Sequence, residues 1–247
     1  MSTFGLIGYP LGHSFSKKYF TSKFEREGIE DCRYELFPVE HIAAVTELIA
    51  SNPDLRGLNV TIPYKVAVLP FLQETEAAAK AIGAVNCIAV SREGGRITLK
   101  GYNTDAYGFS ESLKPLLGPQ HTAALILGDG GAARAVKYVL DTLQISWKSV
   151  VRKPEEHQLG YAQLDEAVLQ QHRLIINTSP VGTFPDIDAA PAIPYPYLGP
   201  EHLLYDLVYN PEMTAFLKQG KARGAAVKNG LEMLRLQAER SWTIWNT

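Results

Sequence analysis

The sequence predicts an α/β fold of two domains, the second of the Rossmann type. Three observations lead to this prediction. Strand-like and helix-like segments alternate through residues 1–108. A glycine-rich turn at residues 128–131 joins an apolar strand to a helix, and a second alternating series follows it. Alternation of this kind is typical of mostly parallel sheets with helices packed on their faces.

The first series opens with two strands and two helices. TFGLIGY at 3–9 and CRYELFPV at 32–39 are strand-like. A helix is expected at 14–28, with its aromatic residues on one face and Gly28 as its stop. A second helix is expected at 40–51, where apolar residues recur at helical spacing.

The next strand, in GLNVTIPYK at 57–65, ends in a proline turn. Apolar residues alternate with Asn59 and Thr61, as expected for a strand with one apolar and one polar face. Pro63 ends the strand because it has no backbone N–H to donate. The strand tip therefore presents an amide, a hydroxyl and, from Lys65, an ammonium group.

A hairpin and a helix complete the first series. AVNCIAVS at 84–91 and RITLKGYN at 96–103 flank REGG and predict an antiparallel hairpin. Asp105 follows directly, between a strand and a helix. It is a candidate functional carboxylate, and a helix cap is an equally good interpretation. Ser14 and Ser16 begin the helix at 14–28, where they can cap it or bind a polar ligand; His13 has no role assigned to it.

The sharpest local signal is LILGDGGAARAV, which matches the pattern G-x-G-x-x-A of dinucleotide-binding proteins. Its glycines permit a tight turn and a close approach of the backbone to a pyrophosphate at the helix N-terminus. A glycine turn without a ligand is the alternative. Asp129 would oppose anion binding if its carboxylate pointed into the turn. The candidate cofactor residues of this turn are Gly128, Gly130, Gly131 and Ala132.

The residues after the next strand bear on cofactor choice. Arg152 and Lys153 lie 152 − 128 = 24 residues after the first glycine, where an acidic residue would select NAD. Two cations there fit the 2′-phosphate of NADP, and a solvated basic turn is the alternative. Further strands are expected at 173–179 and 203–209, and a helix at 231–245.

Composition excludes several classes of protein. Lys+Arg 24 against Asp+Glu 26 gives a net charge of −2, so no overall field attracts nucleic acid or anionic membranes. Cys32 and Cys87 are expected to be core thiols, with no disulfide and no metal site. No signal peptide is recognised, and no apolar run approaches the ~18 residues of a membrane span. We expect a soluble, cytoplasmic protein.

Taken in order, these motifs resemble the shikimate dehydrogenase family over nearly the whole chain. GYPLGHSFS resembles the family's substrate-binding serine motif, NVTIPYK its catalytic-lysine motif and GAVNCI its substrate-asparagine strand. GYNTDAYG resembles the catalytic-aspartate motif, GDGGAARA the glycine loop and NTSPVG the nucleotide-side loop. YDLVYNPEMT and NGLEMLRLQ are similar to the two C-terminal signatures.

The resemblance implies NADPH-dependent, reversible reduction of 3-dehydroshikimate to shikimate, on the route to aromatic amino acids. It implies a substrate-binding catalytic domain at 1–108, an NADP-binding Rossmann domain at 109–229 and an active-site cleft between them. The terminal helix at 230–247 would pack back on the first domain. Lys65 and Asp105 would be the catalytic pair. The substrate residues would be Ser14, Ser16, Thr61, Asn86, Tyr209 and Gln237, and the further cofactor residues Arg152, Asn177, Thr178 and Gly230.

Three departures from the family's pattern concern the cofactor side. Val151 and Lys153 flank the phosphate arginine, where the family usually has Asn before it and Ser or Thr after it. Asp129 replaces a usual small residue. The segment 153–172 is short, which predicts that a helix after this arginine is trimmed. These departures bear on cofactor affinity and selectivity.

Two other functions remain open at this point. An NAD-dependent quinate/shikimate dehydrogenase would need an acidic residue where Arg152 and Lys153 stand. A non-catalytic sensor of shikimate-type ligands would be marked by loss of Lys65 or Asp105, and both are present.

Overall fold

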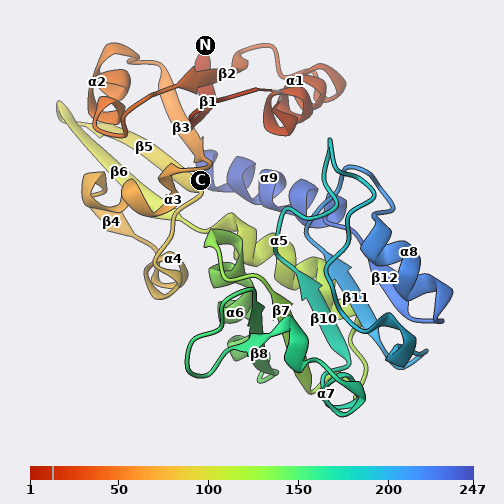
Figure 1. The fold of residues 1–247 in the computed structure, drawn as a ribbon. Helices are drawn as coiled ribbons and strands as arrows, with labels where there is room; N and C mark the ends of the chain where they lie inside the picture. The colour runs from red at the N-terminus through yellow and green to blue at the C-terminus, as the bar shows by residue number, and fades with distance from the viewer. Residues whose placement is uncertain (13) are drawn as a thin grey trace. The chain divides into compact units, whose positions relative to one another are not determined.

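The computed structural model describes residues 1–12 and 14–247, which form two compact units (Figure 1). The first unit comprises Met1–Thr104 and Ala238–Thr247, and the second comprises Asp105–Gln237. The sequence places the main boundary near Gly108, and the structure divides at Thr104. His13 lies outside the described residues.

The sheet of the first unit runs in the order β2-β1-β3-β5-β6-β4 (Figure 1). Its first three strands are parallel, and β5 and β6 form an antiparallel hairpin, which confirms the REGG turn. The strands are β1 Ser2–Gly8, β2 Cys32–Pro38, β3 Leu55–Val60, β4 Glu74–Thr75, β5 Cys87–Glu93 and β6 Arg96–Tyr102.

Short and long helices connect these strands. The predicted stop of α1 is confirmed, since Gly28 adopts a φ of 64° and its N–H donates to Glu25 O. Helix α2 begins at Ala44, later than the expected helix at 40–51. Elements of two to six residues between Tyr64 and Ile82 had no clear signal in the sequence. The helices are α1 Phe15–Glu27, α2 Ala44–Ser51, α3 Tyr64–Ala67 and α4 Ala77–Ile82, with a 3-10 turn at Leu69–Phe71.

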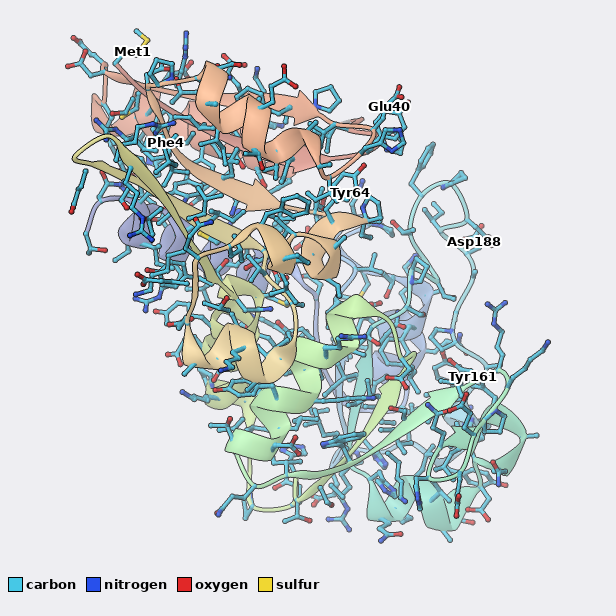
Figure 2. All side chains as sticks on the ribbon, turned by 90° about the vertical axis from the view of Figure 1, so that its left-hand side faces the viewer. Met1, Phe4, Glu40, Tyr64, Tyr161 and Asp188 are labelled. Carbon is cyan, nitrogen blue, oxygen red and sulfur yellow. The ribbon has the colours of Figure 1, made fainter. Side chains whose placement is uncertain are left out.

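Residues 238–247 form part of the core of the first unit. The alternation of β1 buries Phe4 on one face of the sheet, with α1 and Ala238, and Ile7 on the other face, with α2. Trp245 stacks on Phe4 with ring centroids 4.9 Å apart, and its Nε1 donates to Ile88 O over 3.0 Å. Figure 2 shows Phe4 within this packed region.

The second unit has a fully parallel sheet in the order β12-β11-β10-β7-β8-β9 (Figure 1). This is the doubly wound order of Rossmann domains, in which ligands bind where the strand order reverses, here between β7 and β10. The predicted fold class is confirmed. The strands are β7 Ala123–Leu127, β8 Ser146–Val151, β9 Leu159–Gly160, β10 Leu174–Asn177, β11 Leu203–Asp206 and β12 Ala226–Lys228.

The helices of this unit bury apolar faces against the sheet. In α6 the buried side chains are Ala133, Ala135, Val136, Val139 and Leu140, which recur at helical spacing. No helix occurs within residues 152–158, which agrees with the trimmed crossover that the sequence predicts. The helices are α5 Thr104–Leu113, α6 Gly131–Thr142, α7 Glu166–Gln171 and α8 Ala215–Ala222, with 3-10 turns at Lys114–Leu116, Tyr161–Gln163 and Tyr195–Tyr197. Helix α9 Leu231–Trp245 belongs to the second unit up to Gln237 and to the first unit from Ala238 on.

Among the helices of the described residues, none combines the length and the apolar character that a bilayer-crossing helix requires.

Candidate functional site

Polar residues of the first unit gather at one edge of its sheet because of the strand directions. Parallel β1 and β3 end at this edge, and Thr61 follows β3. Antiparallel β5 begins there, directly after Asn86, and β6 ends there, just before Asn103 and Thr104. Val60 N donates to Asn86 O over 2.9 Å, which aligns the two strand ends.

Asn86 and Thr104 are tied together at this edge. Thr104 N donates to Asn86 Oδ1 over 2.6 Å, and Asn86 Nδ2 donates to Thr104 Oγ1 over 3.0 Å. Both side chains are buried, at 3% and 1% exposure. These bonds fix Thr104 against the start of β5.

Asn59 has a structural role within the first unit. Tyr34 Oη donates to Asn59 Oδ1 over 2.8 Å, and Asn59 Nδ2 donates to Ser241 Oγ over 3.0 Å. Asn59 is therefore satisfied inside the unit, between β2 and α9. The polar tip expected from GLNVTIPYK is thus formed by Thr61 and Lys65 alone.

Thr61 and Lys65 lie on one tight turn at the end of β3. Thr61 N donates to Ile7 O, and Tyr64 N donates back to Thr61 O, each over 2.9 Å. Val85 N donates to Lys65 O over 2.7 Å, and Tyr64 Oη donates to Val39 O over 2.6 Å. Figure 2 shows Tyr64 on the short helix α3. The backbone that carries the half-buried Lys65 side chain is therefore held from two sides.

The serines begin α1 as the sequence predicts. Ser14 caps the helix, with Lys17 N donating to Ser14 Oγ over 3.3 Å. Ser16 is half-buried in the first turn of the helix. Burial raises the pKa of Tyr34 well above its ordinary value, and a hydrogen bond with Ser16 opposes part of this rise.

In the second unit, Asp105 occupies the first turn of α5, where a carboxylate is favoured by the helix dipole. Three residues on, a Cβ at Gly108 would overlap Met233 O and lie 3.2 Å from Gln237 Cβ. This glycine therefore allows α5 and α9 to pack closely. Gln237 is 6% exposed, and its Nε2 donates to Leu234 O over 2.9 Å.

The glycine turn between β7 and α6 has the backbone geometry of an anion site. Gly128 has a φ of 109°, and a Cβ there would lie 3.0 Å from Thr178 Oγ1. Apart from the adjoining backbone, no atom of the described residues lies within 4 Å of a Cβ built at Gly130 or Gly131. No side chain caps α6 at Gly130. The first N–H groups of α6 thus remain open to a ligand oxygen, as a bound pyrophosphate requires.

The Asp129 carboxylate is bound by two side chains. Its carboxylate forms an ion pair with Lys137 and accepts a 2.7 Å hydrogen bond from Gln158 Nε2. The lysine offsets the negative charge that the sequence places in the glycine turn. The turn therefore fits a phosphate group despite this carboxylate.

Arg152 and Lys153 follow the last residue of β8 and are exposed. Within the described part of the chain, no carboxylate lies at ion-pair distance from either side chain. The Arg152 cation lies near Tyr161, whose pKa is raised by burial and partly lowered by this charge. Two cations without carboxylate partners fit a 2′-phosphate.

The loop after β10 rests on a buried carboxylate. Asn177 Nδ2 and Val208 N donate to Asp206 Oδ1 over 2.9 Å and 3.0 Å, and Thr214 Oγ1 donates to Asp206 Oδ2 over 2.6 Å. Asn177 Oδ1 accepts from Ser179 Oγ over 2.6 Å. Burial raises the pKa of Asp206, and these hydrogen bonds oppose the rise. Thr178 Oγ1 donates to Leu127 O over 3.0 Å, which joins this loop to the glycine turn.

Gly230 and Tyr209 lie at the carboxyl ends of β12 and β11. Gly230 N donates to Val208 O over 3.2 Å, and a Cβ at Gly230 would overlap Leu207 O. Only glycine fits this close approach of two backbones. The Tyr209 side chain is 38% exposed.

Sequence reasoning missed the residues that support this site. Ser241, Asp206 and Gln158 had no assigned role, because each acts through a partner far away in the chain. Asp206 did carry one signal, since it is an acidic residue at the end of an apolar strand.

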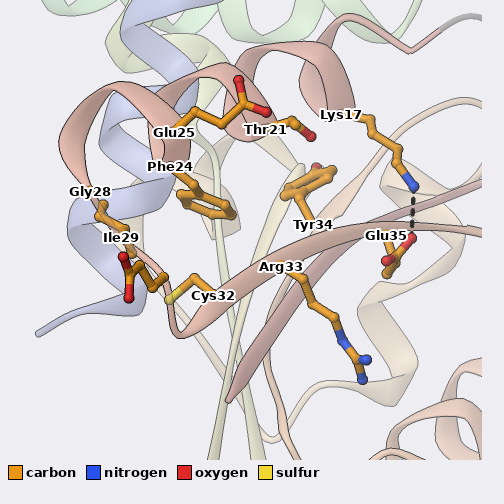
Figure 3. Close-up of a pocket in the computed structure, with 11 residues that line it drawn as sticks. Lys17, Thr21, Phe24, Glu25, Gly28, Ile29, Cys32, Arg33, Tyr34 and Glu35 are labelled. Atoms are coloured by element: carbon orange, nitrogen blue, oxygen red, sulfur yellow. Dashed lines mark hydrogen bonds and ion pairs between the residues drawn. The ribbon is translucent and has the colours of Figure 1, made fainter.

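A cavity of about 540 Å³ lies elsewhere in the first unit, between α1 and β2 (Figure 3). An ion pair of 2.7 Å between Lys17 and Glu35 lies at its border. No predicted site residue lines it. The lining residues are Lys17, Thr21, Phe24, Glu25, Gly28, Ile29, Glu30, Cys32, Arg33, Tyr34 and Glu35.

Comparison with known proteins gives consistent matches. Residues 6–88 match the family model of the shikimate dehydrogenase substrate binding domain. The chain is 38% identical to the shikimate dehydrogenase (NADP(+)) of Carboxydothermus hydrogenoformans, over 98% of this chain and 90% of that protein.

Solved structures give the same result over the full length of the chain. A chorismate mutase/shikimate 5-dehydrogenase fusion protein from Clostridium acetobutylicum matches with a TM-score of 0.85 and 35% identity, over 99% of this chain and 90% of that one. A shikimate 5-dehydrogenase from Thermus thermophilus, in complex with NADP(H) and shikimate, matches with a TM-score of 0.84 and 33% identity, over 99% of this chain and 93% of that one.

Proposed function

The chain belongs to the shikimate dehydrogenase family, and we propose that it catalyses the reversible, NADPH-dependent reduction of 3-dehydroshikimate to shikimate. The observation that carries this proposal is the turn after β3, which holds Thr61 and Lys65 at the polar edge of the first sheet. The basic end of β8 beside an uncapped glycine turn supports NADP as the cofactor.

Reduction of a ring ketone needs a hydride at carbon and a proton at oxygen. NADPH supplies the hydride when it is bound. In the proposed mechanism Lys65, as an ammonium, donates a proton to the ketone oxygen, so that no free alkoxide accumulates. In shikimate oxidation a neutral Lys65 removes the proton from the hydroxyl. Asp105 completes the acid–base pair.

In this proposal one unit binds the substrate and the other binds the cofactor. The first unit is the substrate-binding domain, in which Ser14, Ser16, Thr61 and Asn86 bind the hydroxyls and carboxylate of the substrate. Tyr209 and Gln237 bind the same substrate in this proposal. The second unit is the NADP-binding domain, whose cofactor residues are Gly128, Gly130, Gly131, Ala132, Arg152, Asn177, Thr178 and Gly230.

The geometry of the second unit supports the proposed cofactor residues. Gly130 and Gly131, with the N-terminus of α6, would hold the pyrophosphate, and Arg152 would hold the 2′-phosphate. Asn177 is fully buried, so it would act through the shape of its loop. We further propose that the enzyme is cytoplasmic and works as a monomer or homodimer. Light scattering on a sizing column measures the number of chains in each particle and so tests the oligomeric state.

An absorbance assay tests the function. Purified protein is mixed with shikimate and NADP⁺, and formation of NADPH is followed. We expect turnover with NADP⁺ and much slower turnover with NAD⁺. Faster turnover with NAD⁺ and quinate would support a quinate/shikimate dehydrogenase. Binding of shikimate without turnover would support a sensor.

A further inference from the structure

The connection between β8 and β9 is unusually short for two parallel strands. Val150 pairs with Leu159 and Val151 pairs with Gly160, so residues 152–158 alone make the crossover. Parallel neighbours normally need a connection of about a dozen residues or more, most often a helix. Here residues 152–158 contain no helix, and the segment must be ordered by other contacts.

Gln158 supplies such a contact from both ends of its amide. Its side-chain Oε1 accepts from Glu155 N over 3.0 Å, and its backbone N donates to Glu155 O over 3.1 Å. These two bonds close a turn. Its Nε2 reaches the glycine turn and donates to Asp129 Oδ2 over 2.7 Å. One side chain therefore joins the segment that begins with Arg152 to the turn proposed to hold the pyrophosphate.

Asp129 accepts this bond while Lys137 offsets its charge. Lys137 also lies over the Trp147 ring, 4.7 Å from its centroid. A hydrogen bond to a carboxylate is stronger than one between neutral groups, which suits a single contact that must order a loop. Asp129, which departs from the family pattern, thus serves as the acceptor that holds Gln158.

We propose that the Gln158–Asp129 hydrogen bond positions Arg152 for the 2′-phosphate and thereby sets the preference for NADP over NAD. This inference rests on the proposed function. Gln158 and Asp129 are positioning residues, since neither needs to touch the phosphate. Without the bond, ordering of residues 152–158 would have to accompany binding, and that entropic cost would weaken the 2′-phosphate contact only.

Replacement of Lys137 is expected to affect cofactor binding differently. If it is replaced by methionine, the Asp129 carboxylate stays in the glycine turn without its ion pair. It would then repel the pyrophosphate, which both cofactors share. Lys137→Met should therefore weaken NADP⁺ and NAD⁺ alike, whereas loss of Gln158 should weaken NADP⁺ selectively.

The test measures equilibrium binding of NADP⁺ and NAD⁺ to the full chain by calorimetry, without substrate. For Gln158→Ala we expect the Kd for NADP⁺ to rise roughly fivefold or more, while the Kd for NAD⁺ changes less than about twofold. Gln163→Ala is the matched control. Gln163 Oε1 accepts from Gly160 N over 2.7 Å in a similar turn but has no bond to the glycine turn. The control should leave both constants within about twofold.

Two further measurements keep the test decisive. Amide hydrogen exchange of residues 152–158 in the free protein should speed up in Gln158→Ala and stay unchanged in Gln163→Ala. In an Asp129→Ala background, Gln158→Ala should have a much smaller effect on the Kd for NADP⁺, because only the contact with Glu155 N remains to be lost. Gln158→Glu, which sets two carboxylates against each other, should reproduce the selective loss of NADP⁺.

Three outcomes would overturn the inference: equal weakening of both cofactors in Gln158→Ala, a full effect that persists in the Asp129→Ala background, or no change. Each is distinct from failure of the proposed function, in which the unaltered protein itself neither binds NADP⁺ nor turns over shikimate.

Discussion

Asn177 Nδ2 donates to Asp206 Oδ1 over 2.9 Å, and both side chains are fully buried in the second unit. The carboxylate accepts hydrogen bonds from Asn177, Val208 and Thr214 and has no cationic partner among the described residues. It therefore supports the loop after β10 at an electrostatic cost, because a buried charge is poorly solvated.

This cost predicts a pH dependence of stability. Burial raises the pKa of Asp206 above its ordinary value of about 4. At a pH between the ordinary pKa of the unfolded state and the raised pKa of the folded state, the folded state holds a proton that the unfolded state has lost. The free energy of unfolding therefore falls as pH rises through this window. Asp206→Asn removes this titration. Urea unfolding of both proteins should show the free energy of unfolding of the original chain declining relative to the variant as pH rises. A constant difference would contradict the prediction.

Lys65→Met should abolish most of the catalysis while leaving binding largely intact. General acid–base catalysis typically contributes about 10²–10⁴-fold, so kcat should fall by about that factor with little change in the KM for shikimate. Asp105→Asn should also lower kcat, and the double variant should be little worse than the worse single one, since the pair acts as a unit. The exposed Lys80 on α4 offers the control Lys80→Met, which should keep normal kcat. A near-normal kcat in Lys65→Met would show that Lys65 is not the acid–base residue.

Arg152→Ala should weaken NADP⁺ about tenfold or more and leave NAD⁺ nearly unchanged. A charge-assisted contact with the 2′-phosphate is worth about 1.5–3 kcal/mol, and NAD⁺ lacks that phosphate. The KM values for the two cofactors measure this effect. Arg173, which pairs with Glu201 over 3.2 Å before β10, provides the control Arg173→Ala. Equal weakening of both cofactors would show that Arg152 is structural.

Gly57→Ala should destabilise the first unit. A Cβ at Gly57 would overlap the Trp245 ring, whose indole N–H is bonded to Ile88 O. Overpacking of this kind typically costs about 1–3 kcal/mol. At Gly199 no atom lies within 4 Å of an added Cβ, so Gly199→Ala should change the free energy of unfolding by less than about 0.5 kcal/mol. Urea unfolding followed by tryptophan fluorescence compares the two, and equal stabilities would refute the steric argument.

The sequence predicts best where a local pattern decides the structure. The end of α1 at Gly28, the hairpin at 92–95 and the glycine turn at 128–131 each follow from the conformation that a few neighbouring residues require. The edge that collects Thr61 and Asn86 follows from strand order, which the alternating pattern suggests only in outline.

The remainder depends on contacts between distant segments. Asn59 has the pattern of a polar strand residue, yet it faces Ser241 of α9, 182 positions further along the chain. The four-residue helix α3 is too short to show a period and is held by Val85 and Val39. The support that Gln158 gives to the glycine turn also crosses 29 positions, and no local rule could identify it.

The place of residues 238–247 has a consequence for the order in which the chain can fold during translation. Ser241 and Trp245, on α9, complete the core of a unit whose strands emerge from the ribosome more than a hundred residues earlier. Until these residues are synthesised, Asn59 lacks the hydroxyl of Ser241 and Phe4 on β1 lacks the indole ring of Trp245. The second unit, continuous from Asp105 to Gln237, needs no such late arrival. Nascent chains released before residue 238 should therefore yield a protease-resistant second unit and a protease-sensitive first one, the reverse of simple N-terminal-first folding.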